Sequence, residues 1–352
     1  MPSVRHVDYA IIGQGLAGSL IAHFLRQRGR RIHVFDDGHC SSSSTVAAGI
    51  INPITGWRFV KSWRIDELLP FAKQTYRSLE HHLRADFLME TDIIRSIHSQ
   101  KDQNNWLVRS ALPDYAPYMA DEVDWTGFEK QIYPPFSVGT VQQGCRINCG
   151  KFLEEYKKAL IEDSQYSEQA VRETDLAQLL AGQAIDGVAT TAVIDCRGYR
   201  SKIEGPFQQL PFGGSKGEVL LVKIPNARFS RLFKNRIFIV PMEDDLYWIG
   251  SAYENDFKDD RPTEKGKQTL REKLEAALRV PYEIVDHRAA IRPTVKDRRP
   301  FLGTHPEIPN LHIFNGLGTK GASLGPFFAE QLAAHLCEGA PLDDTVNIAR
   351  FG

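Results

Sequence analysis

The sequence predicts an α/β protein that opens with a Rossmann-like nucleotide-binding unit, and three observations near its start support this fold class. A short apolar strand, YAII, runs into a turn that carries Gly13, Gly15 and Gly18 in the pattern G-x-G-x-x-G. Residues 16–28 then have the spacing of an amphipathic helix. A second apolar strand, RIHVF, ends at Asp36. In this βαβ order the start of the helix forms a binding site for a pyrophosphate.

Each glycine has a distinct role in such a unit. The first makes the tight turn, the second lets a phosphate approach the backbone, and the third lets helix and strand pack closely. Asp36 follows Gly18 by 18 residues, where an acidic residue accepts a hydrogen bond from a ribose hydroxyl. The neighbouring Leu16, Ala17 and Asp37 belong to the same predicted site. The pattern leaves NAD and FAD open as the dinucleotide, and a structural glycine turn is the alternative.

The composition sets limits on the class of protein. A chain of 352 residues with a net charge of −1 can form two or three packed units, and this charge disfavours broad electrostatic capture of nucleic acid. No run approaches the roughly 18 apolar residues of a membrane helix, and no apolar signal core precedes the first strand, so we expect a cytoplasmic protein. Five scattered cysteines, Cys40 among them, suit reduced thiols and form no zinc pattern, so no metal is expected.

A serine-rich segment, SSSSTVAAGIINP, occupies residues 41–53 after the second strand. It resembles the loop that runs under the pyrophosphate and the flavin in FAD-dependent enzymes of the D-amino acid oxidase and glycine oxidase family. Ile50 stands where the family often has a second glycine, and a flexible serine linker is the alternative. The resemblance assigns the following residues to the cofactor site: Ser44, Thr45, Ala47, Ala48 and Gly49.

Two middle segments follow the order of the same family. EQAVRE (168–173) resembles the strand whose backbone passes the adenine, with Val171 as the matching residue. AVIDCRGYRS (192–201) resembles an apolar strand that ends in a glycine turn. This match assigns Cys196 and Gly198 to the cofactor site, although the family usually has Ala-Ala-Gly where this chain has DCRG.

The C-terminal segments AAIRPTVKDRRPFLG (289–303) and NGLGTKGASLGP (315–326) resemble the two C-terminal signatures of the family. Glycines before the last helix let backbone N–H groups approach a negatively charged edge of the reduced flavin, and the helix N-terminus carries about half a positive charge. A plain helix-start loop with a solvated lysine is the alternative. The cofactor residues implied here are Gly316, Gly318, Thr319, Lys320 and Gly321.

The resemblance implies that Arg292 and Lys320 are the catalytic residues, with Arg292 also close to the cofactor. In amine-oxidising relatives the arginine of this Arg-Pro motif binds the substrate carboxylate, through two charge-assisted hydrogen bonds. The alternative is an arginine that ties two domains together. Ala290 stands where a glycine is usual. Candidate pocket walls, with sheet packing as the alternative, are Tyr247, Trp248 and Tyr253.

The family pattern also implies the domain organisation. It predicts a Rossmann-like FAD-binding domain of the glutathione-reductase type, with a smaller α+β substrate domain on a mixed or antiparallel sheet. The FAD-binding domain is expected from residues 1–85, 140–205 and 286–352, and the substrate domain from 86–139 and 206–285.

The leading prediction is an FAD-dependent oxidoreductase that oxidises a C–N bond of an amino acid or related amine by hydride transfer to flavin N5. FAD is expected to be bound non-covalently, since no cysteine lies near the last glycine-rich loop. GLGTKG also resembles the flavin half of the bifunctional enzyme that modifies wobble uridine in tRNA. A carboxymethylamino group of tRNA is therefore the alternative substrate, and a non-catalytic flavin-binding protein is a third reading. The sequence leaves the substrate, the electron acceptor and the oligomeric state open.

Overall fold

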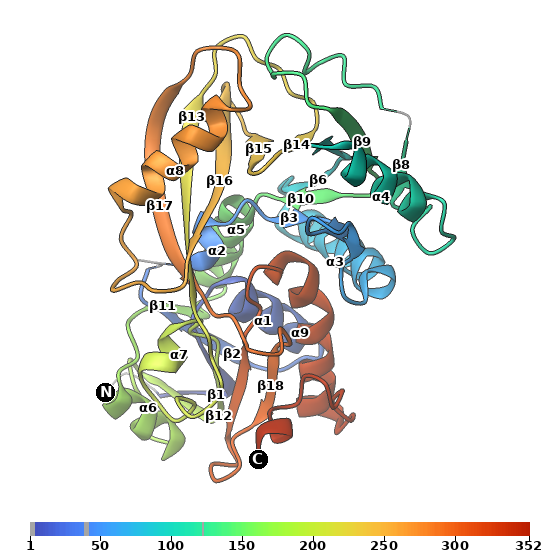
Figure 1. Ribbon diagram of the computed structural model, residues 1–352. Coiled ribbons are helices and arrows are strands. Elements are labelled where there is room, and N and C mark those ends of the chain that lie inside the picture. Colours follow the sequence, from blue (N-terminus) through green and yellow to red (C-terminus); the bar gives the residue numbers. More distant parts are fainter. Residues whose placement is uncertain (1–3, 39–41, 122) are drawn as a thin grey trace.

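The computed structural model describes residues 4–38, 42–121 and 123–352. The predicted reduced thiol of Cys40 and the first serine of the serine-rich segment, Ser41, lie outside the described residues. Figure 1 shows two main layers of sheet, one above the other, with both ends of the chain at the lower one. Within the described ranges, no helix is both long enough and apolar enough to cross a membrane.

The lower sheet has six strands and contains the predicted βαβ unit. Its first five strands in spatial order are parallel, and the sixth is antiparallel. The predicted opening unit is confirmed, because β1 and β2 flank helix α1 (Leu16–Gln27) and pair with each other. The spatial order is β11 (Tyr166–Glu168), β2 (Ile32–Asp36), β1 (Arg5–Ile12), β12 (Val188–Asp195), β19 (Leu311–Asn315) and β18 (Phe301–Thr304).

The predicted strand over residues 168–173 is wrong in its position. Strand β11 ends at Glu168, and helix α6 (Glu173–Leu180) begins five residues later. The backbone N–H of Arg172 donates to Asp175 Oδ2 at 3.0 Å, which caps the helix and stops the chain from extending further. Val171 therefore lies in a connecting loop, where its side chain is buried.

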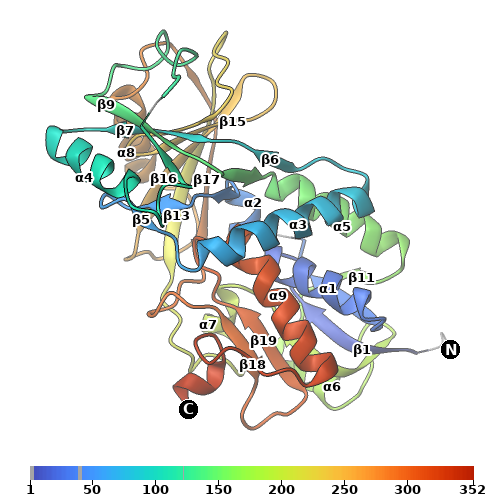
Figure 2. The same cartoon turned by 90° about the vertical axis from the view of Figure 1, so that its right-hand side faces the viewer.

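Four helices pack against one another beside the lower sheet. They are α1, α9 (Gly321–Glu338), α3 (Ile65–Leu83) and α5 (Cys149–Glu162), and Figure 2 shows them gathered on one side. Two shorter helices, α6 and α7 (Arg200–Ile203), lie near the opposite face in Figure 1. Two short elements complete the N-terminal part, helix α2 (Ser43–Val46) and the hairpin of β4 (Ile54–Thr55) and β5 (Val60–Lys61).

The upper sheet has eight strands and is mixed, as predicted, because β14 runs parallel to β7 while the other neighbours are antiparallel. Helix α8 (Glu264–Glu275) packs on β13 and β16, and helix α4 (Gln100–Ser110) lies beside β8. The spatial order is β17 (Glu283–Arg292), β13 (Ser215–Lys223), β16 (Leu246–Glu254), β15 (Phe238–Pro241), β14 (Leu232–Lys234), β7 (Ile93–Ile97), β9 (Ser137–Val141) and β8 (Met119–Ala120).

A continuous core joins the two layers. Ile11 and Leu20 of the lower layer belong to the same buried cluster as Val219 and Trp248 of the upper sheet. A small sheet of β3 (Ile50–Ile51), β10 (Cys145–Ile147) and β6 (Leu88–Glu90) bridges the layers, and the 3-10 helix η1 (Ile348–Phe351) ends the chain. The strands of the lower sheet come from the three pieces predicted for the FAD-binding domain. The domain boundaries themselves remain a proposal.

The first turn of α9 depends on a hydrogen bond from another helix. Pro326 has no N–H group, so the carbonyl of Ala322, four residues earlier, has no partner within the helix. The hydroxyl of Tyr76 in α3, which is fully buried, donates to that carbonyl at 3.1 Å. A buried carbonyl without a partner is costly, and Tyr76 thus holds the start of α9 against α3.

We expect Tyr76→Phe to destabilise the protein by about 1–3 kcal/mol, because it leaves the Ala322 carbonyl buried without a donor. The midpoint of urea unfolding, followed by tryptophan fluorescence, measures the loss. Tyr133→Phe is the matched control, since it removes a hydroxyl from a half-exposed ring. Equal midpoints for the two variants would contradict this role of Tyr76.

Candidate functional site

A cavity of about 870 Å³ lies along the carboxyl ends of the parallel strands. Five neighbouring strands each contribute a lining residue at or just after their ends, namely Val171, Asp36, Gly13, Cys196 and Leu317. Since strands are about 4.8 Å apart, these five ends span about 19 Å. Ligands of such sheets bind outside the carboxyl ends of the strands. The cavity therefore suits an extended ligand that crosses the whole sheet.

The N-terminus of α1 opens into this cavity. Gly15 at the N-cap has no side-chain cap, and the Leu16 N–H donates to Ser44 Oγ at 3.1 Å. A Cβ at Gly15 would lie 3.1 Å from the same Ser44 oxygen, so glycine lets the serine loop approach the helix start. Gly13 has a φ of +98°, which glycine adopts without strain. Uncapped N–H groups at a helix start favour an anion.

Two acidic residues lie at the end of β2, where Asp36 is the last residue of the strand and Asp37 follows it. The Asp36 carboxylate accepts hydrogen bonds from the Gln14 N–H at 2.7 Å and from the Gly38 N–H at 2.9 Å. Asp37 forms an ion pair with Arg200 at 2.5 Å. The carboxylate of Asp36 is thereby fixed beside the glycine turn, where the ribose contact was predicted.

Small residues and one tryptophan form the middle of the cavity. Gly49 has a φ of +71°, and a Cβ there would lie 1.9 Å from the Ile147 carbonyl oxygen, so only glycine fits. Trp248 of β16 donates from Nε1 to the Val46 carbonyl at 2.9 Å. This bond ties the upper sheet to the loop that carries Ala47 and Ala48, which also line the cavity.

The turn after β12 departs from the family pattern but satisfies its own buried charges. Arg197 pairs with Asp195 at 2.8 Å, and the Ser201 hydroxyl donates to the same carboxylate at 2.8 Å. Asn315 at the end of β19 donates to Ser201 Oγ at 3.0 Å and to the Gly198 carbonyl at 2.9 Å. Arg197 replaces a small residue of the pattern, and its charge is neutralised locally.

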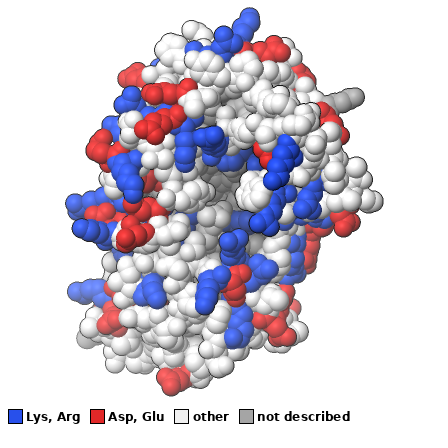
Figure 3. Space-filling model, in the orientation of Figure 1, with Lys and Arg blue, Asp and Glu red and all other residues white. Residues whose placement is uncertain are grey.

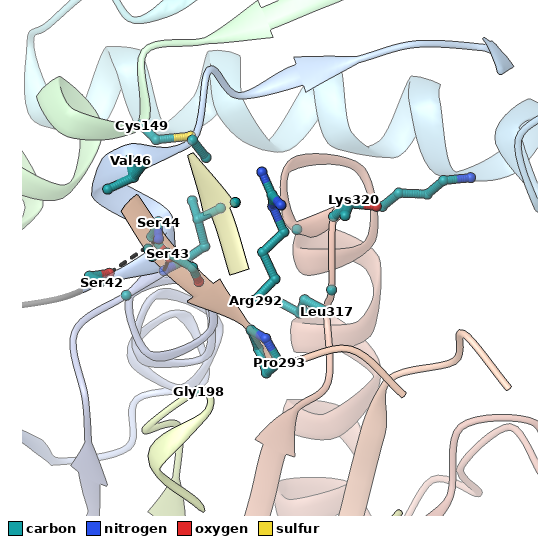
Figure 4. A pocket seen from close by; sticks show the side chains of 18 of the residues that line it. Ser42, Ser43, Ser44, Val46, Cys149, Gly198, Arg292, Pro293, Leu317 and Lys320 are labelled. Atoms are coloured by element: carbon teal, nitrogen blue, oxygen red, sulfur yellow. Dashed lines mark hydrogen bonds between the residues drawn. The ribbon is translucent and has the colours of Figure 1, made fainter. Parts of the chain in front are cut away.

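The last glycine-rich turn brings α9 to the cavity. Lys320 is the N-cap of α9 and provides no side-chain cap. Its side chain extends away from Arg292 in Figure 4. Burial lowers the pKa of Lys320, and the nearby charges of Arg298 and Arg299 lower it further. Lys320 thus lines the cavity, while its ammonium group lies near two other cations. Its catalytic role stays a prediction.

Arg292 ends β17 and projects into the cavity (Figure 4). Its guanidinium lies against Gly217 of β13. A Cβ at this glycine would be only 2.1 Å from Nη1, so the guanidinium occupies the space that a side chain would need. Nη2 donates to Ser251 Oγ at 3.2 Å, and the Tyr253 ring lies 4.8 Å from Cζ. Nη1 is buried and has no hydrogen-bond partner among the described residues. Burial lowers the pKa of this guanidinium from its usual value.

Most residues predicted from sequence line this cavity, together with Trp248, Tyr253 and Ala290. Three of the predicted cofactor residues do not. Gly18 packs against the backbone, since a Cβ added there would lie 1.8 Å from the Gly13 carbonyl oxygen. The Thr45 hydroxyl donates to the Ser42 carbonyl at 2.9 Å. Gly316 packs against Val295, since a Cβ added there would lie 2.7 Å from that side chain. The predicted residues that line the cavity are Gly13, Gly15, Leu16, Ala17, Asp36, Asp37, Ser44, Ala47, Ala48, Gly49, Val171, Cys196, Gly198, Arg292, Gly318, Thr319, Lys320 and Gly321.

Sequence reasoning missed other lining residues and misplaced one. Tyr247 lies outside the cavity, because its hydroxyl donates to the buried Ala227 carbonyl at 2.5 Å. Arg95 and Lys234, which were not predicted, line the cavity from two neighbouring strands. These strands lie far apart in the sequence, so no local pattern brings the two cations together. Gly217 of β13 also lines the cavity, and the signal that could have found it is a glycine inside a strand, which indicates a close approach.

The chain matches one family model and is similar to several known proteins. The family model described as FAD dependent oxidoreductase matches residues 8–335. An uncharacterized oxidoreductase of Bacillus subtilis (strain 168), YurR, is 24% identical over 93% of this chain and 94% of its own length. The tRNA 5-methylaminomethyl-2-thiouridine biosynthesis bifunctional protein MnmC of Idiomarina loihiensis is 22% identical over 98% of this chain, which spans 59% of that protein. The crystal structure of glycine oxidase from Geobacillus kaustophilus superposes with a TM-score of 0.79 at 21% identity, covering 99% of this chain and 98% of that one.

We expect the buried thiols to resist alkylation in the folded protein. Burial raises the pKa of Cys149 and of Cys145 to about 12, and it raises the pKa of Cys196 as well. At pH 8 these thiols are therefore neutral and poorly nucleophilic. Iodoacetamide followed by peptide mass spectrometry is expected to label Cys337, which is partly exposed, before these three. Unfolding in urea should remove the difference, and rapid labelling of Cys149 in the native state would contradict it.

Proposed function

The chain belongs to the FAD dependent oxidoreductase family, and from this premise we propose that it oxidises the C–N bond of an amino acid or a related amine. FAD is the cofactor of this family. The observation that carries the proposal is the guanidinium of Arg292, which lies in the cavity with one buried nitrogen that has no hydrogen-bond partner in the described part of the chain. A carboxylate is the ligand whose geometry matches such a planar donor.

The residues along the strand ends fit an extended dinucleotide. The remaining N–H groups in the first turn of α1 would bind the pyrophosphate, and Asp36 would accept a ribose hydroxyl. The segment of Ala47, Ala48 and Gly49 would lie against the flat ring, since its side chains are short. The start of α9 would add backbone N–H groups from a second uncapped helix.

When bound, FAD supplies a two-electron acceptor that takes a hydride from the carbon beside the amine, so that the product imine can be hydrolysed by water. The protein's own residues position the substrate for this chemistry. Arg292 would bind the carboxylate and hold the substrate in one orientation, which is a large part of catalysis when reacting atoms must be in near contact. Ser251 and Tyr253 hold the guanidinium from β16, the strand on the other side of β13.

Energetics favour a bound carboxylate at Arg292. A buried cation without a counter-ion carries a desolvation cost of several kcal/mol, and the lowered pKa of Arg292 reflects that cost. A substrate carboxylate would offset it by forming a charge-assisted pair with the guanidinium. A neutral amine without the carboxylate would leave the guanidinium unpaired, and we therefore expect the carboxylate to be required.

The experiment is anaerobic flavin reduction by glycine, sarcosine, proline and D-amino acids, followed by stopped-flow absorbance. At least one of these amines is expected to bleach the flavin, and the amide glycinamide is expected to react about 100-fold more slowly than glycine. Arg292→Ala should remove this preference, since truncating one partner of a buried charge pair costs about 2–5 kcal/mol. A colourless protein that takes up no FAD, or a preference unchanged in Arg292→Ala, would contradict the proposal.

We also expect Gly217→Ala to mimic a partial loss of Arg292. The added methyl group would occupy the space of the guanidinium, which must then move off β13. Because the carboxylate would meet a displaced partner, KM for the carboxylate substrate should rise at least tenfold. Gly127→Ala is the control, since a Cβ at Gly127 meets no atom within 4 Å. Equal KM values for the two variants would exclude this spatial role.

A second candidate is oxidation of a carboxymethylamino group in tRNA, which the likeness to MnmC favours. That group also presents a carboxylate beside a secondary amine, so Arg292 would act in the same way. The two candidate substrates differ in the group attached to the amine, which is small in a free amino acid and is a nucleoside of tRNA in the other case. Reduction of the flavin by a modified tRNA and by none of the free amines would favour the second candidate.

A further inference from the structure

A second group of cations lines the same cavity and is separated from Arg292 along the upper sheet by β13, β16 and β15. Arg95 of β7 and Lys234 of β14 are directly opposite each other in the two paired strands, and Arg236 follows in the adjoining loop. Resting on the proposed function, we propose that Arg95, Lys234 and Arg236 form a second anion subsite. The substrate is then an amino diacid, an amine with one carboxylate for Arg292 and a second anionic group for this subsite.

These three cations have no carboxylate partner. Among the described residues, none of them has an acidic oxygen within 4.0 Å, whereas Arg197 and Arg200 in the same cavity each have at least one. The acid that acts on Arg95 most directly is Asp102, which accepts a hydrogen bond from Ser99 at 2.9 Å. The cationic side chains near the proposed dinucleotide site are therefore neutralised by acidic partners, whereas the end of the cavity at β7 and β14 keeps a net positive charge.

Arg95 and Lys234 are held in place by contacts that leave their charges uncompensated. Arg95 Nη2 donates to the Gly56 carbonyl at 2.9 Å, and Lys234 Nζ donates to the Arg236 carbonyl at 3.3 Å. The Lys234 ammonium lies 4.4 Å from the centre of the Phe238 ring. Like charges directly opposite each other in neighbouring strands destabilise a sheet. A bound anion would remove this repulsion, and it would be fixed by preorganised donors.

The positions along the sheet indicate that one carboxylate cannot serve both ends. The Arg292 guanidinium lies over Gly217 in β13, and the Lys234 ammonium lies over Phe238 in β15. Two strand spacings separate β13 from β15, or about 10 Å. An ion pair needs about 4 Å or less between nitrogen and oxygen. The second anionic group must therefore stand several bonds away from the first.

Burial favours a small diacid over the phosphates of an RNA chain. Figure 3 shows Lys and Arg side chains around a hollow in the face of the molecule. Of the three cations, Arg236 is exposed, while Arg95 and Lys234 are partly buried and line the cavity. A phosphate backbone would contact exposed cations at the rim. The partly buried pair is better suited to a group that enters with the substrate.

The charge of Lys234 adds a dependence on pH. Burial lowers the pKa of Lys234 to about 7, with further lowering by Arg95 and by Lys273 of α8. The other ionisable groups near this subsite are Arg236 and His98, whose own pKa is lowered mainly by burial. The free protein therefore loses the Lys234 charge as pH rises through about 7. Binding of the second anion should weaken over the same range, relative to binding of a monoacid.

The test uses the FAD-loaded protein and a pair of amines that differ in one group. N-(2-carboxyethyl)glycine carries the second carboxylate, and N-(2-carbamoylethyl)glycine replaces it with a neutral amide of the same shape. We expect the diacid to reduce the flavin at least tenfold more efficiently, in kred/Kd, at pH 6.5, and the ratio to fall by pH 8.5. Lys234→Met should lower the ratio to about one. Lys223→Met is the control, since Lys223 is exposed at the end of β13 and lies outside the cavity.

A binding measurement separates this inference from the proposed function. By calorimetry, glutarate should bind the FAD-loaded protein at least tenfold more tightly than butyrate, and Lys234→Met should remove the difference without loss of FAD. If glycine or the amide reacts as well as the diacid, and glutarate has no advantage, the second subsite is wrong while the proposed function stands. If no carboxylate amine reduces the flavin, the proposed function fails. Reduction by a modified tRNA alone would overturn the assignment to a small diacid.

Discussion

The first turn of α9 is the constraint on which the arrangement of the cavity depends. Residues of this turn line the cavity, while the rest of the helix packs on α1 and α3. Pro326 weakens the helix where it leaves the turn, and the Tyr76 hydroxyl restores the missing hydrogen bond from α3. Because α1 also begins at the cavity, any shift of α9 would change the distance between the two helix N-termini. The position of the cofactor site is thus set by contacts between helices behind it.

Charge is distributed unevenly along the cavity, and this has a physical consequence. Near the turns after β2 and β12, cations and anions form pairs, as between Arg197 and Asp195. Because these side-chain charges are already paired, the backbone N–H groups at the start of α1 provide the main attraction for a phosphate. At the other end of the cavity, Arg292, Arg95 and Lys234 have no acidic partner among the described residues, and burial lowers the pKa of each. The substrate end of the cavity therefore stores an electrostatic cost that only a bound anion relieves.

Much of the lower sheet could be predicted because its signals are local. The turn from Gly13 to Gly18 and the acid at Asp36 lie within one βαβ unit, where sequence distance and spatial distance agree. The strand implied by resemblance at 168–173 was misplaced, since β11 ends at Glu168 and the contact of Arg172 with Asp175 caps the helix that follows. For Lys320 the sequence shows a cation in the right loop, but the direction of a long side chain depends on its neighbours.

The upper sheet was harder to predict, because its important contacts join distant segments. Arg95 and Lys234 meet only through the pairing of β7 with β14, and the sequence contains no mark of that register. The role of Tyr76 depends in the same way on a proline in another helix. Resemblance to a family supplied Arg292, yet it did not supply the glycine that the guanidinium rests on.

The contact between Gly217 and Arg292 links two positions on different strands. A side chain of any size at the first position would expel the guanidinium from the second. In descendants of a common ancestor, the two sites should accordingly be inherited as a unit. A relative that has lost the glycine is expected to have lost the arginine too, or to recognise its substrate from another direction.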